Sequence, residues 1–247
     1  MSAHIIARSG WSSLEHEMAM LRYAANLSGK EKAKILFLNT ASASTPEFVA
    51  GAKQKIEWIG CEFSTLDFFG SINPNYEDYI NSHDVLHVGG GNTRSMLAVW
   101  REYGLDQTLR KANEQGLVLS GFSAGALCWF EQCLTDSLQG EPQVLKGLGF
   151  LKGSACPHYD SEELRAPTYI KKIKSKEILP GFALRDFTAI HFVDGKLFKA
   201  ITTQEDKTPS YVDKDGEEKI LATIPLLGPP VRTNSQYAPK QAPDLKP

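Results

Sequence analysis

The stretch Leu117-Val118-Leu119-Ser120-Gly121-Phe122-Ser123-Ala124-Gly125-Ala126 decides the fold. It begins as a short apolar run, continues as Gly-x-Ser-x-Gly, and leads into the apolar residues Ala126 to Phe130. A strand, a sharp turn and a helix in that order are typical of a nucleophile elbow, which presents a serine at the carboxyl edge of a sheet. The stretch therefore predicts an α/β fold in which Ser123 projects from that edge at the start of a helix.

Two further apolar runs precede this stretch, Lys34–Leu38 and Val85–Val88, and each ends in small or polar residues. Strands without alternation of polar and apolar residues are expected in a parallel sheet that is covered on both faces. Helix-like segments lie between the runs, so βαβ units with right-handed crossovers are expected.

Three helices are predicted in this half of the chain. One starts at Thr45-Pro46, with Thr as the N-cap residue and Pro at the first helical position. The others run from Thr93 to Trp100 and from Gln107 to Glu114. The residues expected on the apolar face of the first helix are Phe48, Ala52, Ile56 and Trp58.

After about residue 185 the sequence no longer alternates between predicted strands and helices. Ala189–Val193 and Leu197–Ile201 flank Asp194-Gly195, and Asp-Gly favours the type I′ turn of a β-hairpin. Residues 229–247 contain five Pro and are expected to form a flexible tail. Residues 1–228 are therefore predicted to be a single α/β domain with a C-terminal β-hairpin region.

Composition excludes several classes of protein. The chain has 247 residues, of which 42% are hydrophobic and 23% charged, and its net charge is −2. It is too apolar to be disordered, and it lacks the excess of basic residues that a nucleic-acid-binding protein needs. It shows no secretory signal and no apolar stretch long enough to cross a bilayer. Its four Cys form no CxxC pair and are expected to be reduced thiols, so we expect a cytoplasmic protein.

A second glycine-rich segment, Gly89-Gly90-Gly91-Asn92-Thr93, also lies between a strand and a helix. It could form an anion cradle or only a tight loop, but it lacks the Lys-Ser/Thr of a P-loop. Because the carboxyl ends of parallel strands meet at one sheet edge, the segment is expected beside Ser123. The N–H groups of Gly90 and Ala124 are then candidates for an oxyanion hole.

A serine nucleophile needs a base and an acid that orients the base. Of the six His, His158 and His191 lie downstream of Ser123, and the Pro-containing segment around His158 favours that residue as the base. The residues alone barely rank the acids. The candidates are Asp136, Asp160, Glu162, Glu163 and Asp186.

Three motifs in this order resemble those of the dipeptidase E family, the Asp-specific serine dipeptidases related to cyanophycinase. They are Val88-Gly89-Gly90-Gly91-Asn92-Thr93, Gly121-Phe122-Ser123-Ala124-Gly125-Ala126 and Cys156-Pro157-His158-Tyr159-Asp160. The resemblance covers most of residues 30–200. It implies a flavodoxin-like, class I glutamine amidotransferase-like three-layer sandwich with a mostly parallel sheet.

The resemblance also implies roles for individual residues. Ser123 matches the nucleophile and His158 the general base, and Gly90 and Ala124 match the oxyanion donors. Asp186 aligns with the third member of the triad, which is usually Glu in the family, and Asp136 is held in reserve for that role. A second departure is Ala7-Arg8-Ser9-Gly10-Trp11, where relatives have a Gly-rich loop.

The predicted function is that of a serine exopeptidase for short peptides, by resemblance dipeptides with N-terminal Asp. No metal or cofactor is expected, and Arg165 is a candidate for binding the Asp carboxylate. The expected partner is a small peptide substrate, with no nucleic acid and no membrane, and a homodimer is a possible assembly. Two alternatives are an α/β-hydrolase-type esterase that uses Ser123, Asp160 and His191, and a non-catalytic module of the same fold that binds a small ligand.

Overall fold

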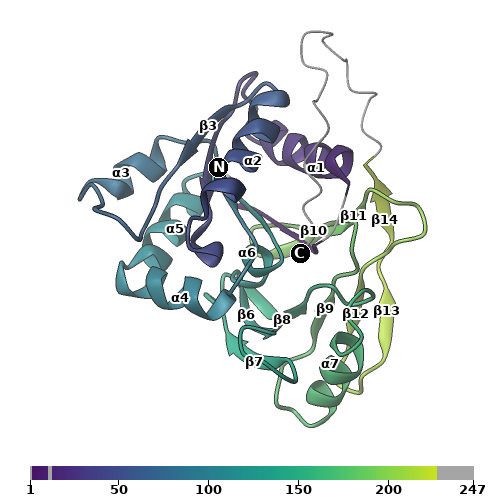
Figure 1. The fold of residues 1–247 in the computed structure, drawn as a ribbon. Helices are drawn as coiled ribbons and strands as arrows, with labels where there is room; N and C mark the ends of the chain where they lie inside the picture. The colour runs from purple at the N-terminus through teal and green to yellow at the C-terminus, as the bar shows by residue number, and fades with distance from the viewer. Residues whose placement is uncertain (1, 11–12, 227–247) are drawn as a thin grey trace.

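A computed structural model describes residues 2–10 and 13–226 (Figure 1). The larger of the two sheets that these residues form has eight strands, which are β1 (His4–Arg8), β2 (Lys34–Leu38), β3 (Glu62–Thr65), β4 (Val85–Val88), β5 (Val118–Phe122), β10 (Thr188–Val193), β11 (Lys196–Thr202) and β14 (Thr223–Pro225). Their order is β14-β11-β10-β1-β5-β4-β2-β3. Strands β1, β5, β4, β2 and β3 pair in parallel, whereas β10 pairs antiparallel with β1 and β11. The prediction of a mostly parallel sheet is confirmed.

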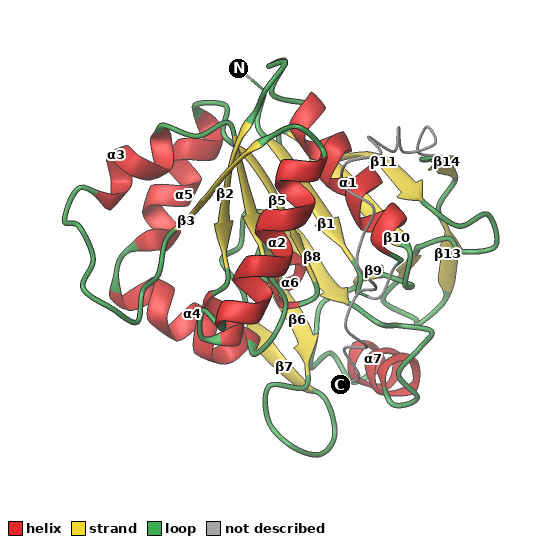
Figure 2. Ribbon diagram, turned by 45° about the horizontal axis from the view of Figure 1, so that its top comes forward, coloured by secondary structure: helices red, strands yellow, loops and turns green. Residues whose placement is uncertain are grey.

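Helices cover both faces of this sheet (Figure 2). They are α1 (Leu14–Asn26), α2 (Pro46–Trp58), α3 (Tyr76–Asn81), α4 (Thr93–Glu102), α5 (Leu105–Glu114) and α6 (Ala124–Leu127), with a 3-10 turn at Thr40–Ser42. Helices α1 and α2 pack on one face, and α3 to α6 on the other. Successive residues of a strand pack on opposite faces of the sheet. Val118 belongs to the hydrophobic cluster under α1 and α2, and Leu119 to the cluster on the other face. This double coverage explains the continuous apolar runs of the sequence.

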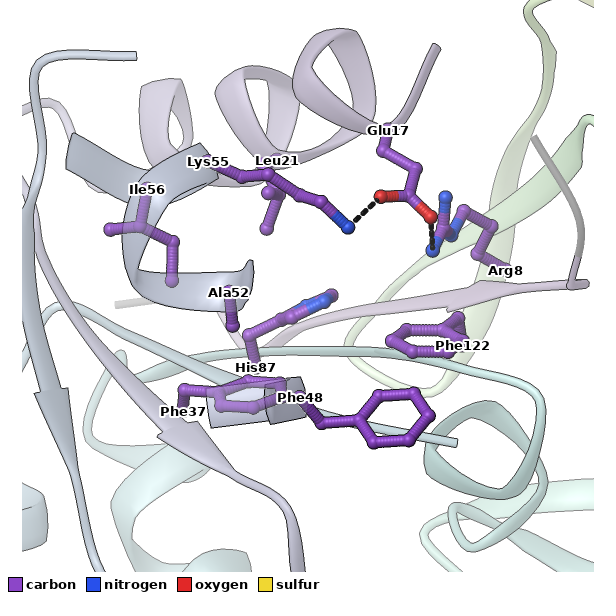
Figure 3. A pocket seen from close by; sticks show the side chains of 10 residues that line it. All are labelled: Arg8, Glu17, Leu21, Phe37, Phe48, Ala52, Lys55, Ile56, His87 and Phe122. Carbon is purple, nitrogen blue, oxygen red and sulfur yellow. Dashed lines mark hydrogen bonds and ion pairs between the residues drawn. The ribbon is translucent and has the colours of Figure 1, made fainter. Parts of the chain in front are cut away.

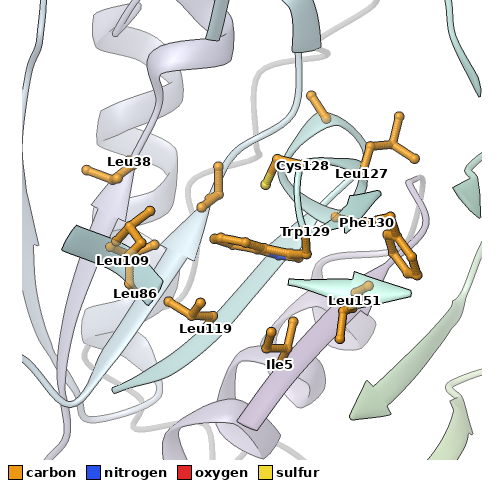
Figure 4. Close-up of a cluster of buried hydrophobic side chains, with 14 of the residues drawn as sticks. Ile5, Leu38, Leu86, Leu109, Leu119, Leu127, Cys128, Trp129, Phe130 and Leu151 are labelled. Carbon is orange, nitrogen blue, oxygen red and sulfur yellow. The ribbon is translucent and has the colours of Figure 1, made fainter. Parts of the chain in front are cut away.

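The larger core is centred on two tryptophans. Trp100 of α4 and Trp129, which follows α6, are fully buried with their ring centroids 6.2 Å apart. Figure 4 shows Trp129 among aliphatic side chains of the sheet and of α5, including Leu86, Leu109 and Leu119. Leu119 of β5 and Ala124, Ala126 and Leu127 of α6 belong to this core, so its packing fixes both sides of the turn that carries Ser123.

A second sheet follows the first α/β half, and the local sequence pattern does not predict it. Its strands are β6 (Phe130–Thr135), β7 (Gln143–Lys146), β8 (Leu151–Cys156), β9 (Gly181–Ala183), β12 (Ser210–Val212) and β13 (Glu218–Ile220), in the order β13-β12-β9-β8-β6-β7. Helix α7 (Arg165–Lys174) packs against it through Tyr169 and Ile173. This sheet matters for the site, because His158 follows β8 and Asp186 follows β9.

The predicted C-terminal hairpin is confirmed. Strands β10 and β11 pair antiparallel around Asp194 and Gly195, whose φ angles of 50° and 74° are those that a type I′ turn requires. The side chain of Asp194 also accepts a hydrogen bond from the backbone of Ala3 at 2.9 Å. The predicted tail at residues 229–247, and the domain boundary at 228, lie outside the described residues.

One core prediction is wrong. Ile56 of α2 is fully buried, but Phe48 is 57% exposed. Phe48 lies in the first turn of α2, near the carboxyl edge of the sheet, where the helix borders a cavity instead of the core. Among the described residues, no helix is long and apolar enough to cross a membrane.

Candidate active site

Ser123 lies in the turn between β5 and α6 and adopts a rare backbone conformation, with φ 51° and ψ −118°. The glycines on either side make this turn possible. A Cβ atom on Gly121 would lie 2.3 Å from the carbonyl oxygen of Gly125, and one on Gly125 would lie 2.3 Å from the carbonyl oxygen of Val88. Only glycine fits at both positions, so the Gly-x-Ser-x-Gly pattern is a steric requirement of the sharp turn.

His158 reaches the serine from the second sheet. Its Nε2 atom lies 3.0 Å from the Oγ atom of Ser123. The residue is buried and has a φ of 52°, and its backbone N–H donates to the Oγ atom of Ser9 at 2.9 Å. The imidazole is therefore held from both the backbone and the ring, within hydrogen-bond reach of a serine hydroxyl.

Asp186 completes a hydrogen-bonded chain. Its Oδ1 atom lies 3.1 Å from Nδ1 of His158 and also accepts from the Oγ atom of Ser9 and the backbone N–H of Gly10, each at 3.1 Å. Ser161 donates to Oδ2 at 2.5 Å. Burial raises the pKa of the Asp186 carboxyl, but the hydrogen bonds from His158, Ser161 and Ser9 outweigh it, and the net pKa is below the ordinary value. An ionised carboxylate thus faces the imidazole at neutral pH.

Gly90 and Ala124 flank Ser123, as the sequence predicts. A Cβ atom on Gly90 would lie 3.3 Å from the Cβ atom of Ser123, so the glycine-rich loop approaches the serine closely. Ser42 donates to the Gly90 carbonyl oxygen at 2.7 Å and anchors this loop. Ala124 is the first residue of α6, where a backbone N–H has no acceptor within the helix.

Two candidates from the sequence lie away from this chain of hydrogen bonds. Asp136 forms an ion pair with Arg165 at 3.1 Å, and its side chain is 60% exposed. Arg165 is only 2% exposed and also contacts Glu162 at 2.6 Å and the Leu134 carbonyl oxygen at 3.1 Å. The structure thus places Asp136 beside Arg165 rather than beside His158. The Arg165 guanidinium is thus buried and bonded to Glu162, Asp136 and the Leu134 carbonyl oxygen.

The esterase alternative, with Ser123, Asp160 and His191, is wrong because His191 and Asp160 contact other residues. His191 lies within β10, and its ring nitrogens contact Nδ1 of His4 at 2.9 Å and the hydroxyl of Tyr23 at 2.8 Å. Asp160 forms an ion pair with Lys207 and accepts from the backbone N–H of Asp186 at 2.9 Å. His191 is a buried structural residue under α1, and Asp160 supports the loop that carries Asp186.

Sequence reasoning missed three residues that hold the site, Ser9, Gly10 and Ser161. Two signals could have found them. Ser9 and Gly10 follow β1, which pairs in parallel with β5 and so ends at the same sheet edge as Ser123. Ser161 lies three residues after His158, in a turn where the Ser161 and Glu162 N–H groups donate to the His158 carbonyl oxygen.

An α/β sandwich in which serine, imidazole and carboxylate form one hydrogen-bonded chain at a strand–turn–helix junction is the architecture of a hydrolase. Comparison with known proteins shows which family of hydrolases this is. The model of peptidase family S51 matches residues 4–200, and the chain belongs to that family. It is therefore a peptidase, and the resemblance to the dipeptidase E family is confirmed.

The uncharacterized peptidase YgaJ of Bacillus subtilis (strain 168) is 39% identical over 217 residues, which are 88% of this chain and 93% of that protein. A protein described as a peptidase E from Listeria monocytogenes EGD-e has a similar fold, with a TM-score of 0.62 and 18% identity over 83% of this chain and 100% of that one. A peptidase from an acI-B1 Actinobacterium has a TM-score of 0.66 and 14% identity over 90% and 94% of the two chains.

Proposed function

We propose that this chain is a serine peptidase that hydrolyses short peptides through an acyl-enzyme. The observation that carries the proposal is the continuous chain from Ser123 Oγ to His158 Nε2 at 3.0 Å and from His158 Nδ1 to Asp186 Oδ1 at 3.1 Å. Asp186 is the triad acid in this proposal, because it is the carboxylate that contacts the imidazole.

The geometry supports the following steps. Ser123 attacks the scissile carbonyl while His158 takes its proton, and Asp186 holds the imidazole and stabilises its charge. The N–H groups of Gly90 and Ala124 stabilise the oxyanion, with each well-placed donor contributing about 3 kcal/mol in the transition state. His158 then gives its proton to the leaving amine. Water, activated by the same imidazole, cleaves the acyl-enzyme and regenerates Ser123.

We propose dipeptides with N-terminal Asp as the first substrates to test. The resemblance of the three motifs to the Asp-specific serine dipeptidases supports this choice. Arg165 does not, because it is buried and already bonded to Glu162, Asp136 and a backbone carbonyl. The cation that meets the substrate carboxylate must come from another part of the site.

We also propose that the enzyme acts in the cytoplasm. All four cysteines, Cys61, Cys128, Cys133 and Cys156, are unpaired and buried. Unpaired thiols in an enzyme of this size support a reducing compartment.

The function is tested by assaying purified protein on a panel of Asp-X and X-Leu dipeptides. We expect hydrolysis by the wild type, a loss of at least about 10³-fold in kcat for Ser123→Ala, and an unchanged rate for Ser175→Ala, a matched change at an exposed serine. Mass spectrometry after treatment with a fluorophosphonate would show an adduct on the peptide that contains Ser123. Equal hydrolysis by the wild type and Ser123→Ala would overturn the proposal.

A further inference from the structure

The proposed triad draws on both sheets, and different contacts hold its two halves. The nucleophile follows β5 of the eight-stranded sheet, where the Cζ atom of Arg8 lies 4.8 Å from the centroid of the Phe122 ring. Arg8 in turn forms an ion pair with Glu17 of α1 at 3.9 Å, as Figure 3 shows. His158 and Asp186 follow strands of the second sheet, so the position of the base relative to the acid depends on contacts made there.

The base and the acid lie in loops with unfavourable backbone conformations. His158 has a φ of 52°, and Phe187, which follows Asp186, has a φ of 67°. Residues other than glycine keep such angles only where the surrounding structure fixes the chain. One backbone contact between the loops does so, since the N–H of Tyr159 donates to the carbonyl oxygen of Leu184 at 3.1 Å. The side chains next to the base and the acid then decide how firmly the two loops are held together.

Glu218, on the edge strand β13 of the second sheet, connects these loops. Its Oε1 atom accepts a hydrogen bond from the hydroxyl of Tyr159 at 2.7 Å, and its Oε2 atom accepts one from Nη2 of Arg185 at 2.8 Å. Tyr159 directly follows His158, and Arg185 directly precedes Asp186. A single carboxylate therefore bridges the immediate neighbours of the base and the acid.

Further contacts fix both ends of this bridge. The Cζ atom of Arg185 lies over the ring of Tyr159, 5.3 Å from its centroid. Nη1 of Arg185 donates to the Oγ atom of Ser210 at 3.1 Å and to the carbonyl oxygen of Thr208 at 3.0 Å. Ser210, a buried residue of β12, donates to Oε2 of Glu218 at 2.8 Å. The bridge is thus tied to the two outer strands of the second sheet, β12 and β13.

The bridging carboxylate is charged. Burial raises the pKa of Glu218, but the hydrogen bonds from Arg185, Tyr159 and Ser210 outweigh it, and the net pKa is below the ordinary value. Hydrogen bonds to an ionised group are shorter and stronger than those between neutral groups. An ionised Glu218 therefore holds both donors at neutral pH, although its side chain is 28% exposed.

We propose that Glu218 is a positioning residue of the active site, which keeps His158 and Asp186 in register by clamping Tyr159 and Arg185. The proposal rests on the proposed peptidase function for the roles of the base and the acid. Without the carboxylate the strands still pair, but the two loops move more freely. The imidazole is then aligned with its partners for less of the time, which slows the reaction rather than substrate binding.

Steady-state kinetics at 25 °C test this, on the dipeptide that the wild type hydrolyses fastest. Glu218→Gln should lower kcat about tenfold with KM within about twofold, because an amide has a single accepting oxygen and turns a donor towards the other partner. Tyr159→Phe removes one of the two bridging hydrogen bonds and should lower kcat about threefold. The matched control is Glu217→Gln, at the exposed carboxylate next to Glu218, which should keep the wild-type kcat.

The double variant Tyr159→Phe/Glu218→Gln shows whether the two side chains act through one bridge. If they do, its kcat should lie within about twofold of that of Glu218→Gln, because the hydrogen bond is already lost. A kcat reduced by the product of the two single losses would mean independent effects and would overturn the clamp.

Hydrogen–deuterium exchange adds a readout that does not depend on turnover. In Glu218→Gln the amides of residues 158, 159 and 186 should exchange at least about threefold faster, while those of β5 keep their protection. A lower Tm with an unchanged kcat, or unchanged exchange in both loops, would show that Glu218 only stabilises the fold and would overturn the proposal. Failure of the proposed function has a different signature. The wild type would then hydrolyse no dipeptide in a Ser123-dependent way, while exchange in the two loops would still rise in Glu218→Gln.

Discussion

The imidazole of His158 occupies the space that a side chain at residue 10 would need. A Cβ atom on Gly10 would lie 1.7 Å from the Cε1 atom of His158. The backbone N–H of Gly10 also donates to Oδ1 of Asp186 at 3.1 Å. The same glycine thus makes room for the proposed base and holds the proposed acid. This explains how Asp, which is one methylene shorter than the Glu usual in the dipeptidase E family, can reach the imidazole here.

Replacing Gly10 by alanine should displace the imidazole with little change elsewhere. Gly10 is not among the residues of positive φ, so alanine meets no backbone strain and the clash with His158 is the main effect. We expect kcat/KM to fall by about 10²-fold, because displacements of about 1 Å have that cost in positioned active sites. The measurement is steady-state dipeptide hydrolysis, with thermal unfolding to verify the fold.

A matched control for this change is Gly51→Ala in α2, where an added Cβ atom would have no neighbour within 4 Å. It should keep the wild-type rate. A Gly10→Ala enzyme within about threefold of the wild type would show that the imidazole is free to shift without loss of function.

The same Asp→Asn substitution at Asp186 and at Asp136 distinguishes the two candidates for the acid of the triad. Asp186→Asn keeps the shape of the side chain but removes the charge that faces His158, and we expect kcat to fall by about 10³- to 10⁴-fold. Asp136→Asn should leave kcat within about threefold, because Asp136 is exposed and pairs with Arg165. Activity assays of both variants at pH 7.5 decide the matter. A large loss for Asp136→Asn with a small loss for Asp186→Asn would reassign the acid.

Much of the fold and the centre of the site could be predicted from local sequence. Ser123 is revealed by a five-residue turn that only glycines permit, and β2 and β4 are continuous apolar runs because helices cover both faces of their sheet. The second sheet could not be predicted. Strands β7, β9, β12 and β13 have only three or four residues, and β9 pairs with β12 across an intervening part of the chain, so local periodicity carries little signal.

The acid that contacts His158 also could not be identified from local sequence. Asp186 becomes a partner of His158 only because β8 and β9 lie side by side in parallel, which places the segments that follow them together. Nothing in the residues around Asp186 distinguishes it from Asp160, whose oxygen instead accepts from the Asp186 backbone. The sequence around Arg165 likewise gives no sign of its partners, because Asp136 comes from a distant segment of the chain and Glu162 from the turn before α7.

Ser161 is predicted to act as a positioning residue through Asp186. Its hydroxyl donates to Oδ2 at 2.5 Å and is one of the contacts that lower the pKa of this carboxyl. Ser161→Ala should lower kcat by about tenfold while KM changes little, because the hydroxyl donates to Asp186 and acts through that carboxylate. The pKa of Asp186 should rise, so activity should decline at a higher pH on acidification than in the wild type.

The readout for Ser161 is the ratio of kcat at pH 5 to kcat at pH 7.5. Ser161→Thr retains the hydroxyl and should restore most of the wild-type ratio. A loss of kcat that is equal at both pH values in Ser161→Ala, and is not rescued by Thr, would indicate a structural role only.

His191 should make the fold sensitive to acid. Burial, followed by the charges of His4 and Lys199, lowers its pKa to about 4, while an unfolded His titrates near 6.5. Between these values the unfolded state binds more protons than the folded state, so the free energy of unfolding falls as the pH drops below about 6.5. The contribution of His191 amounts to at most about 2 kcal/mol at pH 5. Urea denaturation of the wild type and of His191→Gln at pH 7.5 and pH 5 measures it: the variant should lose less stability on acidification.

Tyr23→Phe is the matched control for His191→Gln. It removes the hydroxyl that contacts Nδ1 of His191 at 2.8 Å but leaves the buried imidazole in place. It should therefore lower stability at pH 7.5 and still show a loss on acidification close to that of the wild type. If His191→Gln loses as much stability between pH 7.5 and pH 5 as the wild type does, the acid sensitivity belongs to other histidines, of which the half-buried His87 has a pKa lowered to about 3.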